Sequence, residues 1–247
     1  VIIFNGEIYN FKSLRTKLEK KGIHFKSDSD TEVLLLLYLQ PGEEMLKELK
    51  GIFSIAIWNK NTESLFLARD GLGVKPLYYS TTSQGFIFSS ELKALLKIYP
   101  DSKKIDPVSL HRYLSFLWCP GTGTPLKGIY KMPPGECITV KKGEIIRKSQ
   151  WYKLPCFDTE PEKMSVNEAV SGTYNKLNQA VERQMVSDVP LGAFLSGGLD
   201  SSAIVSCASN INPDINCFTI KTEGKSDPGF IDDYPYAKKV ANHLGLP

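Results

Sequence analysis

The residues best suited to do chemistry in this chain are 196–202, which read Ser-Gly-Gly-Leu-Asp-Ser-Ser. They join an apolar run at 191–195, which predicts a strand, to a run at 203–208 that is typical of a helix. Glycines let the backbone approach a charged ligand closely, and the first amides of a helix have no partners within the helix. This segment therefore predicts an anion site whose natural ligand is a phosphate group.

The side chains of this segment refine the prediction. The serine hydroxyls can donate to phosphate oxygens, whereas Asp200 would repel a bare phosphate and better suits a magnesium ion that bridges phosphates. The lysine of the Walker pattern is absent, which argues against an ordinary ATPase P-loop. The alternative is a simple turn that caps a helix, but the occurrence of all these elements after a strand favours the phosphate site.

A second group of polar residues, Asn5, Gly6 and Glu7, follows an apolar run at the start of the chain. An Asn-Gly pair is typical of a tight turn, but the Asn5 amide and the Gly6 N–H could also form an oxyanion hole, with Glu7 holding a substrate amine. Asp30 lies in a predicted capping box at 29–32, ahead of a helix at 32–39. Its carboxylate either favours that helix start or receives a ligand ammonium.

Other charged residues are predicted to be structural. We expect Arg69 and Asp70 to form a buried ion pair at a strand end, and Glu91 and Lys93 to support the fold. The three histidines are scattered and share no spacing typical of metal ligands.

The composition excludes several classes of protein. Among 247 residues, 30 are basic and 27 acidic, without a basic run interleaved with aromatics, so nucleic acid is not an expected partner. The longest apolar run, 33–39, is far shorter than the roughly 20 residues that span a bilayer. Five widely spaced cysteines without a C-x-x-C pair favour neither disulfides nor zinc, and indicate a cytoplasmic protein.

The pattern of elements predicts two domains, both incomplete: 1–155, a linker at 156–164, and 165–247. The first is expected to be an α+β domain with one or two helices and antiparallel sheets, from strands at 51–58, 64–68, 77–80 and 85–89 and a hairpin at 137–147. In the second, strands and helices alternate, which predicts an α/β domain with a doubly wound parallel sheet. Because the chain starts at Val1 and stops at Pro247, we expect an internal piece of a longer protein.

Several blocks carry a resemblance to known families. The blocks NGEIYN, SDTE, ARDGLGVKPLYY and FSSELKALL, at 5–10, 29–32, 68–79 and 88–96, resemble the glutaminase domain of class II glutamine amidotransferases. SGGLDSS resembles the pyrophosphate loop of the N-type ATP pyrophosphatases. The order of these blocks in one chain resembles that of the glutamine-hydrolysing asparagine synthetase family. The resemblance covers nearly the whole length of this chain.

This resemblance implies a fold and a set of site residues. The first domain would be Ntn-hydrolase-like, with sheets sandwiched between helices, and the second would be the synthetase domain. Asn5 and Gly6 would form the oxyanion hole, while Glu7 and Asp30 would hold the α-amino group of glutamine. The implied ATP site comprises Leu195 and Ile220 against adenosine, Asp200 on magnesium, and Ser196, Gly197, Gly198 and Ser201 on pyrophosphate.

The activity implied is that of a carbon–nitrogen ligase with glutamine, aspartate and ATP as substrates, in a cytoplasmic homodimer. A cysteine at the mature N-terminus would release ammonia from glutamine, and ammonia would convert an aspartyl-adenylate to asparagine and AMP. None of the five cysteines lies at a terminus, so we expect this chain alone to be inactive. Two alternatives stay open: a related amidotransferase acting on a sugar or β-lactam precursor, and a non-catalytic homologue that binds glutamine or nucleotide.

Overall fold

Two antiparallel sheets stack on each other in the first part of the chain. The computed structural model describes residues 1–99, 103–155, 163–221 and 232–247. The residues group into two units, Val1–Thr159 and Glu160–Pro247, each of which is considered by itself. The predicted linker at 156–164 falls mostly on residues outside the described part.

The larger sheet of the first unit has five strands in the order β1-β2-β3-β7-β8, and every neighbouring pair is antiparallel. The predicted hairpin at 137–147 is present as β7 and β8, and it turns through Lys142 and Gly143, which both have positive φ. The strand bounds are β1 Ile2–Ile8, β2 Gly51–Asn59, β3 Ser64–Arg69, β7 Glu136–Lys141 and β8 Glu144–Gln150.

The smaller sheet has three strands in the order β5-β4-β6, again antiparallel. Its strands are β4 Tyr78–Thr82, β5 Gly85–Ser89 and β6 Tyr130–Lys131. Buried side chains from both sheets meet between them, among them Leu67, Tyr79 and Ile138. The two sheets therefore pack face to face through an apolar layer.

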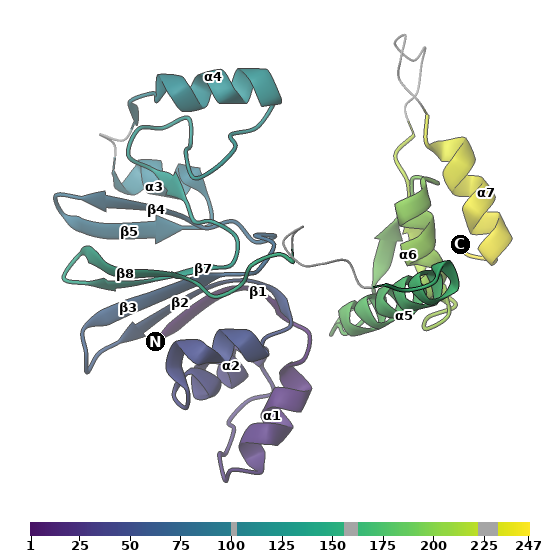
Figure 1. Ribbon diagram of the computed structural model, residues 1–247, viewed down its shortest axis with the longest axis horizontal. Helices are drawn as coiled ribbons and strands as arrows, with labels where there is room; N and C mark the ends of the chain where they lie inside the picture. Colours follow the sequence, from purple (N-terminus) through teal and green to yellow (C-terminus); the bar gives the residue numbers. More distant parts are fainter. Residues whose placement is uncertain (100–102, 156–162, 222–231) are drawn as a thin grey trace. The chain divides into compact units, whose positions relative to one another are not determined.

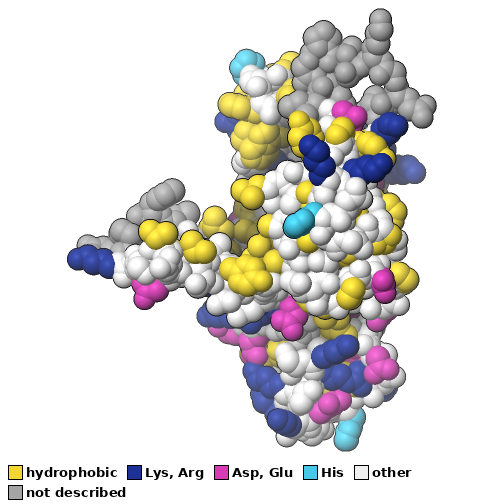
Figure 2. Space-filling view, turned by 90° about the vertical axis from the view of Figure 1, so that its right-hand side faces the viewer, with side chains coloured by type: hydrophobic (Ala, Val, Ile, Leu, Met, Phe, Trp, Pro, Cys, Tyr) yellow, Lys and Arg dark blue, Asp and Glu magenta, His cyan; other side chains and the backbone are white. Residues whose placement is uncertain are grey.

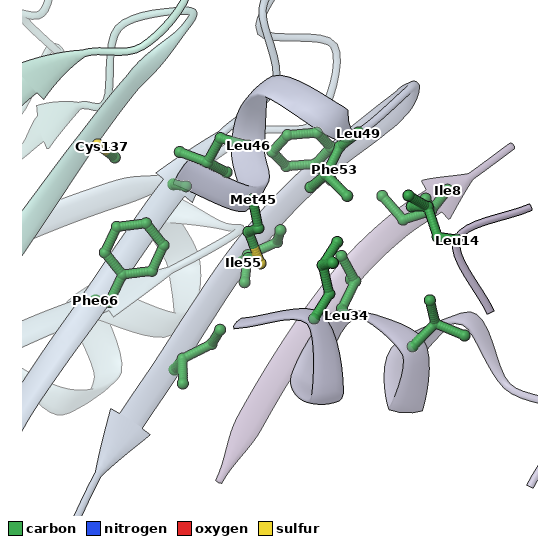
Figure 3. Close-up of a cluster of buried hydrophobic side chains, with 14 of the residues drawn as sticks. Ile8, Leu14, Leu34, Met45, Leu46, Leu49, Phe53, Ile55, Phe66 and Cys137 are labelled. Carbon is green, nitrogen blue, oxygen red and sulfur yellow. The ribbon is translucent and has the colours of Figure 1, made fainter. Parts of the chain in front are cut away.

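Helices cover the outer faces of the two sheets, with α1 and α2 on one side and α3 and α4 on the other (Figure 1). The first core joins the five-stranded sheet to α1, α2 and the short helix η1, and Phe53, Met45 and Leu34 are buried in it (Figure 3). This unit is thus a mixed α/β structure with antiparallel sheets, as predicted. The helices are α1 Phe11–Glu19, α2 Asp30–Tyr38, η1 Gly42–Glu48, α3 Leu92–Ile98 and α4 Pro107–Phe116.

The predicted number of helices in this unit was too low. α4 begins with Asp106 as its N-cap, whose carboxylate accepts from Ser109 N at 3.1 Å, and Pro107 follows at the first helical position. Asp before Pro is a typical helix start, so the signal was present in the sequence.

The second unit contains two parallel strands, β9 Gly192–Phe194 and β10 Asn216–Phe218. A core of small and branched side chains, including Val181, Val205 and Ala237, joins the strands to three helices. The doubly wound sheet stays a prediction, since the described part holds these two strands. The helices are α5 Val166–Gln184, α6 Leu199–Ser209 and α7 Tyr234–Leu244.

Two features of the surface bear on the excluded classes. On the face drawn in Figure 2, acidic and basic side chains are intermixed over α1 and α2, where Arg15 pairs with Glu19 and Lys17 with Glu48. Among the described residues, the helices are all too short or too polar to cross a bilayer.

Candidate functional site

The Asn5–Gly6 pair lies inside strand β1 and not in a turn, so the tight-turn interpretation is wrong. Asn5 faces Ser54 and Gly6 faces Phe53 across the β1–β2 ladder. The apolar run therefore continues as one strand through Ile8. A strand places alternate side chains on one face, so Asn5 and Glu7 point to the same side of the sheet.

Gly6 cannot be replaced by a residue with a side chain without moving the backbone. Its φ is +153°, and a Cβ atom there would lie 2.0 Å from the carbonyl oxygen of Ile52. The main chain of β2 thus approaches the Gly6 backbone closely. The glycine is required by this local geometry, whatever its chemical role.

The Asn5 side chain borders a cavity of about 460 Å³ between β1, β2 and the β5–α3 connection. Asn5 Nδ2 donates to Ser90 Oγ at 3.1 Å, across 85 positions of sequence. The Ser54 hydroxyl, which also borders the cavity, donates to the carbonyl oxygens of Lys75 and Pro76. The Asn5 amide is therefore a neutral donor at the cavity wall, held in place by the Ser90 hydroxyl.

Asp30 reaches the end of the same strand from the first turn of α2. Its Oδ2 accepts from Ile8 N at 3.3 Å, so the carboxylate lies beside the residue that follows Glu7. The structure thereby brings Asp30 to the end of β1, at Ile8, from 22 positions away. Burial, followed by the charges of Glu7 and Asp70, raises the pKa of the nearby Tyr9 hydroxyl.

The predicted capping box at 29–32 is wrong in its hydrogen bonds. Ser29 is the N-cap of α2, but its hydroxyl accepts from Thr31 N at 3.1 Å. The Glu32 carboxylate turns back to Lys26 N and Ser27 N, at 2.9 and 2.7 Å. The helix starts at Asp30, and the hydrogen bonds from Ser27 and Lys26 lower the pKa of Glu32.

Arg69 and Asp70 are structural, as predicted, but they do not form the predicted ion pair. The Arg69 guanidinium donates to the carbonyl oxygens of Lys75, Met132 and Gly73 at 2.5 to 2.7 Å. Asp70 is 1% exposed, and its carboxylate accepts four backbone N–H groups, from Phe53, Leu72, Val74 and Lys75. Both charged groups therefore hold the loop after β3 through its main chain.

The Ser196–Ser202 segment follows β9 and leads into α6, as the sequence predicted, but the helix begins at Leu199, four residues before the predicted start at 203. Gly197 has φ of +76°, and a Cβ atom there would lie 2.4 Å from the carbonyl carbon of Tyr236 in α7. Gly198 is the N-cap residue of α6 and offers no side chain to its first turn. The backbone amides at this helix start therefore lie next to a loop that only glycine can form.

The serines of the loop bond to each other. Ser196 Oγ lies 2.9 Å from Ser201 Oγ and accepts from Gly198 N at 3.3 Å. Ser201 Oγ also accepts from Ser196 N and donates to the Gly198 carbonyl oxygen. These neutral hydrogen bonds occupy donors that a phosphate group would otherwise bind.

The remaining predicted ATP-site residues differ in accessibility. Leu195 is 2% exposed, and its side chain is part of the second unit's core, so a nucleotide could meet only its main chain. Ile220 is 79% exposed and follows β10. Their contacts with adenosine stay a prediction.

Asp200 lies in the first turn of α6 with an exposed side chain. Within the described ranges, no three acidic, histidine or cysteine side chains gather as a metal site. Magnesium is commonly bound by one or two carboxylates together with phosphates and water. A single exposed carboxylate beside the loop fits magnesium that arrives with a phosphate ligand.

Comparisons with known proteins agree with both motifs. A model of the glutamine amidotransferase domain matches residues 1–152, and a model of asparagine synthase matches residues 173–247. The chain therefore belongs to the glutamine amidotransferase family and carries an asparagine synthase segment, which confirms the resemblance seen in the sequence.

Curated relatives give the same result. The chain is 41% identical to asparagine synthetase [glutamine-hydrolyzing] 1 of Bacillus subtilis, over 99% of this chain and 38% of the relative. It is 40% identical to enzyme 3 of that organism, over 84% of the chain and 33% of the relative. A putative asparagine synthetase of Methanocaldococcus jannaschii is 35% identical over 99% of the chain and 46% of its own length. The chain thus spans less than half the length of these relatives.

Proposed function

We propose that this chain provides glutamine and ATP sites of a glutamine-hydrolysing asparagine synthetase. The proposal concerns the activity of a whole protein, since the matched relatives are more than twice as long. The observation that supports it most strongly is the presence of both family matches in one chain, in the order amidotransferase then synthase. The stacked sheets between helices are consistent with an Ntn-hydrolase-like first domain.

In the first unit, glutamine would bind at the end of β1. The Asn5 amide and the Gly6 N–H would donate to the oxygen of the glutamine amide as negative charge develops on it. The single neutral bond from Asn5 to Ser90 is readily exchanged for such an oxygen. Glu7 and Asp30 would accept hydrogen bonds from the substrate α-ammonium group.

The attacking thiol would come from outside the four described cysteines. Cys119, Cys137 and Cys207 are buried, and burial raises the pKa of the Cys137 and Cys217 thiols. A raised pKa disfavours the thiolate, which is the nucleophilic form of a cysteine. Attack by a thiolate on the amide carbon would break the C–N bond, release ammonia and leave a thioester that water hydrolyses to glutamate.

In the second unit, the pyrophosphate of ATP would replace the hydrogen bonds among the loop serines. Gly198 N and the Ser196 and Ser201 hydroxyls would then donate to phosphate oxygens. Asp200 would hold magnesium, which neutralises charge on the leaving pyrophosphate. The aspartate side-chain carboxylate would attack the α-phosphorus and release pyrophosphate, and ammonia would then displace AMP to give asparagine.

Two variants separate these sites in the gene product that contains this chain. Asn5→Ala should lower glutamine-dependent asparagine formation about 100- to 1,000-fold and leave ammonia-dependent formation intact, because an oxyanion donor is lost. Asn61→Ala, at an exposed turn of the same unit, is the matched control. Asp200→Asn should abolish pyrophosphate release and retain glutamate release. Equal loss of both activities in Asn5→Ala, or pyrophosphate release that does not depend on aspartate, would contradict the proposal.

A further inference from the structure

A groove of about 340 Å³ runs between α6 and α7 in the second unit. Ser202 and Ser206, four residues apart, contribute from α6, and Lys239 and His243 have the same spacing on α7. Residues at this spacing share one face of a helix, so two polar pairs face each other across the groove. Val240 and Leu244 complete its lining.

The lining has the chemistry of an anion site. It offers two hydroxyls, an ammonium group and an imidazole, and its six residues include no carboxylate. Hydroxyl, ammonium and ring N–H groups all donate hydrogen bonds to phosphate oxygens. Figure 2 shows basic side chains gathered over α7 with a histidine close to them.

Ser202 supplies an independent observation. Its hydroxyl oxygen is shielded from solvent and has no hydrogen-bond partner among the described residues. Buried polar groups are nearly always paired, and an unpaired one is costly. The Ser202 hydroxyl is therefore a polar group of a groove-lining residue that the described residues leave unpaired.

The groove adjoins the Ser196–Ser202 loop and shares Ser202 with it. Ser202 comes directly after Ser201, whose hydroxyl bonds to that of Ser196. Gly197 packs against Tyr236 of α7. Lys239 Nζ lies 5.8 Å from the centroid of the Tyr236 ring. Helices α6 and α7 therefore lie next to both the loop and the groove. Lys239 and His243 are donors that belong to the groove.

We propose that the α6–α7 groove is a second anion site, which binds a phosphate group through Ser202, Lys239 and His243. The ligand class is inorganic phosphate, pyrophosphate or the phosphate of a nucleotide. This site goes beyond the proposed function, because its donors are separate from those assigned to ATP.

The test is a titration of the ¹⁵N-labelled 247-residue chain with inorganic phosphate, pyrophosphate and AMP in separate NMR experiments. The Val240 and His243 amides report on the groove, while the Gly197 and Gly198 amides report on the loop. The ligand that shifts the groove amides at the lowest concentration identifies the source of the phosphate group.

Two variants probe the groove, with a neighbouring lysine as the matched control. Lys239→Gln should weaken phosphate binding at the groove about 10-fold or more, and Ser202→Ala about 5-fold, because a charged and a neutral donor are lost. Lys238→Gln should change it less than about 2-fold, since Lys238 lies over the Tyr234 ring and does not line the groove. Lys239 is exposed, so its variant remains informative if Ser202→Ala fails to fold.

The outcomes separate this site from the loop. The proposal is supported if phosphate shifts the His243 amide, and if this response is weakened in Lys239→Gln but preserved in Lys238→Gln. This holds whether or not the loop amides respond. Shifts confined to Gly197 and Gly198 overturn the groove proposal and support the loop alone. Equal losses in the two lysine variants, or unshifted groove amides with all three ligands, also overturn it.

Discussion

Replacement of Gly197 by alanine tests whether the phosphate loop depends on close packing against α7. The residue has φ of +76°, and a Cβ atom would lie 2.4 Å from the Tyr236 carbonyl carbon and 2.6 Å from Ala237 N. These neighbours are main-chain atoms in a helix, so they cannot rotate away. The loop and the first turn of α7 must separate to admit the methyl group.

The loss of stability in Gly197→Ala has two contributions. A left-handed backbone costs a non-glycine residue about 1 to 2 kcal/mol, and forced overlap in a packed region adds about 1 to 3 kcal/mol. Gly245 provides the matched control, because its φ is +68° and its Cβ position has no neighbour within 4 Å. Gly245→Ala should therefore show the backbone contribution without the overlap.

Hydrogen exchange measured by mass spectrometry resolves the effect in α6. The difference of about 1 to 3 kcal/mol between the variants corresponds to exchange about 5- to 150-fold faster in Gly197→Ala than in Gly245→Ala. Pyrophosphate binding should be lost in the first variant and retained in the second. Trp58, Trp118 and Trp151 all lie in the first unit, so their fluorescence checks that this unit is unchanged.

Equal acceleration of exchange in the two glycine variants would refute the packing argument. Retained pyrophosphate binding in Gly197→Ala would separately show that the loop tolerates displacement from α7.

Three further predictions concern two carboxylates of the first unit and the described thiols of both units. Asp70→Ala should lower the free energy of unfolding by about 3 to 5 kcal/mol, because one buried and three partly buried N–H groups lose their acceptor. Urea titration followed by tryptophan fluorescence checks this, and a loss no larger than that of the exposed Asp28→Ala would contradict it. Burial raises the pKa of Glu136, so between its unfolded and folded pKa values the folded state keeps a proton that the unfolded state has lost. Stability therefore falls as pH rises through this range, and Glu136→Gln should remove the fall. Urea midpoints measured between about pH 4 and 7 test this, and parallel curves for variant and parent would contradict it. The purified 247-residue chain should release no glutamate from glutamine above a buffer control. Release that disappears on mutation of a described cysteine would contradict the inference that the nucleophile is none of Cys119, Cys137, Cys207 and Cys217.

Local sequence signals predicted those parts of the fold that depend on neighbouring residues. Gly245 is a local signal for the end of α7, and it has the left-handed conformation typical of a residue that follows a helix. Ser165 and Glu168 have the spacing of a capping box, and α5 forms that box in full. The strand–loop–helix order around residues 196–202 was likewise readable from periodicity.

Long-range contacts could not be read in the same way. The Asn5–Ser90 bond joins residues 85 positions apart, and nothing in the local pattern marks Ser90. The predicted pair of Arg69 and Asp70 failed because successive side chains at a strand end point in opposite directions. Each charge is satisfied by the main chain of a folded loop, which a count of adjacent charges cannot anticipate.

The transfer of nitrogen from glutamine to aspartate tests the proposed function most directly. The gene product containing this chain would be supplied with glutamine labelled with ¹⁵N in the side-chain amide, together with aspartate and magnesium ATP. We expect the label in the side-chain amide of asparagine, with about one AMP and one pyrophosphate formed for each asparagine. Label released only as free ammonia, or found in another acceptor while aspartate is unchanged, would contradict the function proposed for these two sites.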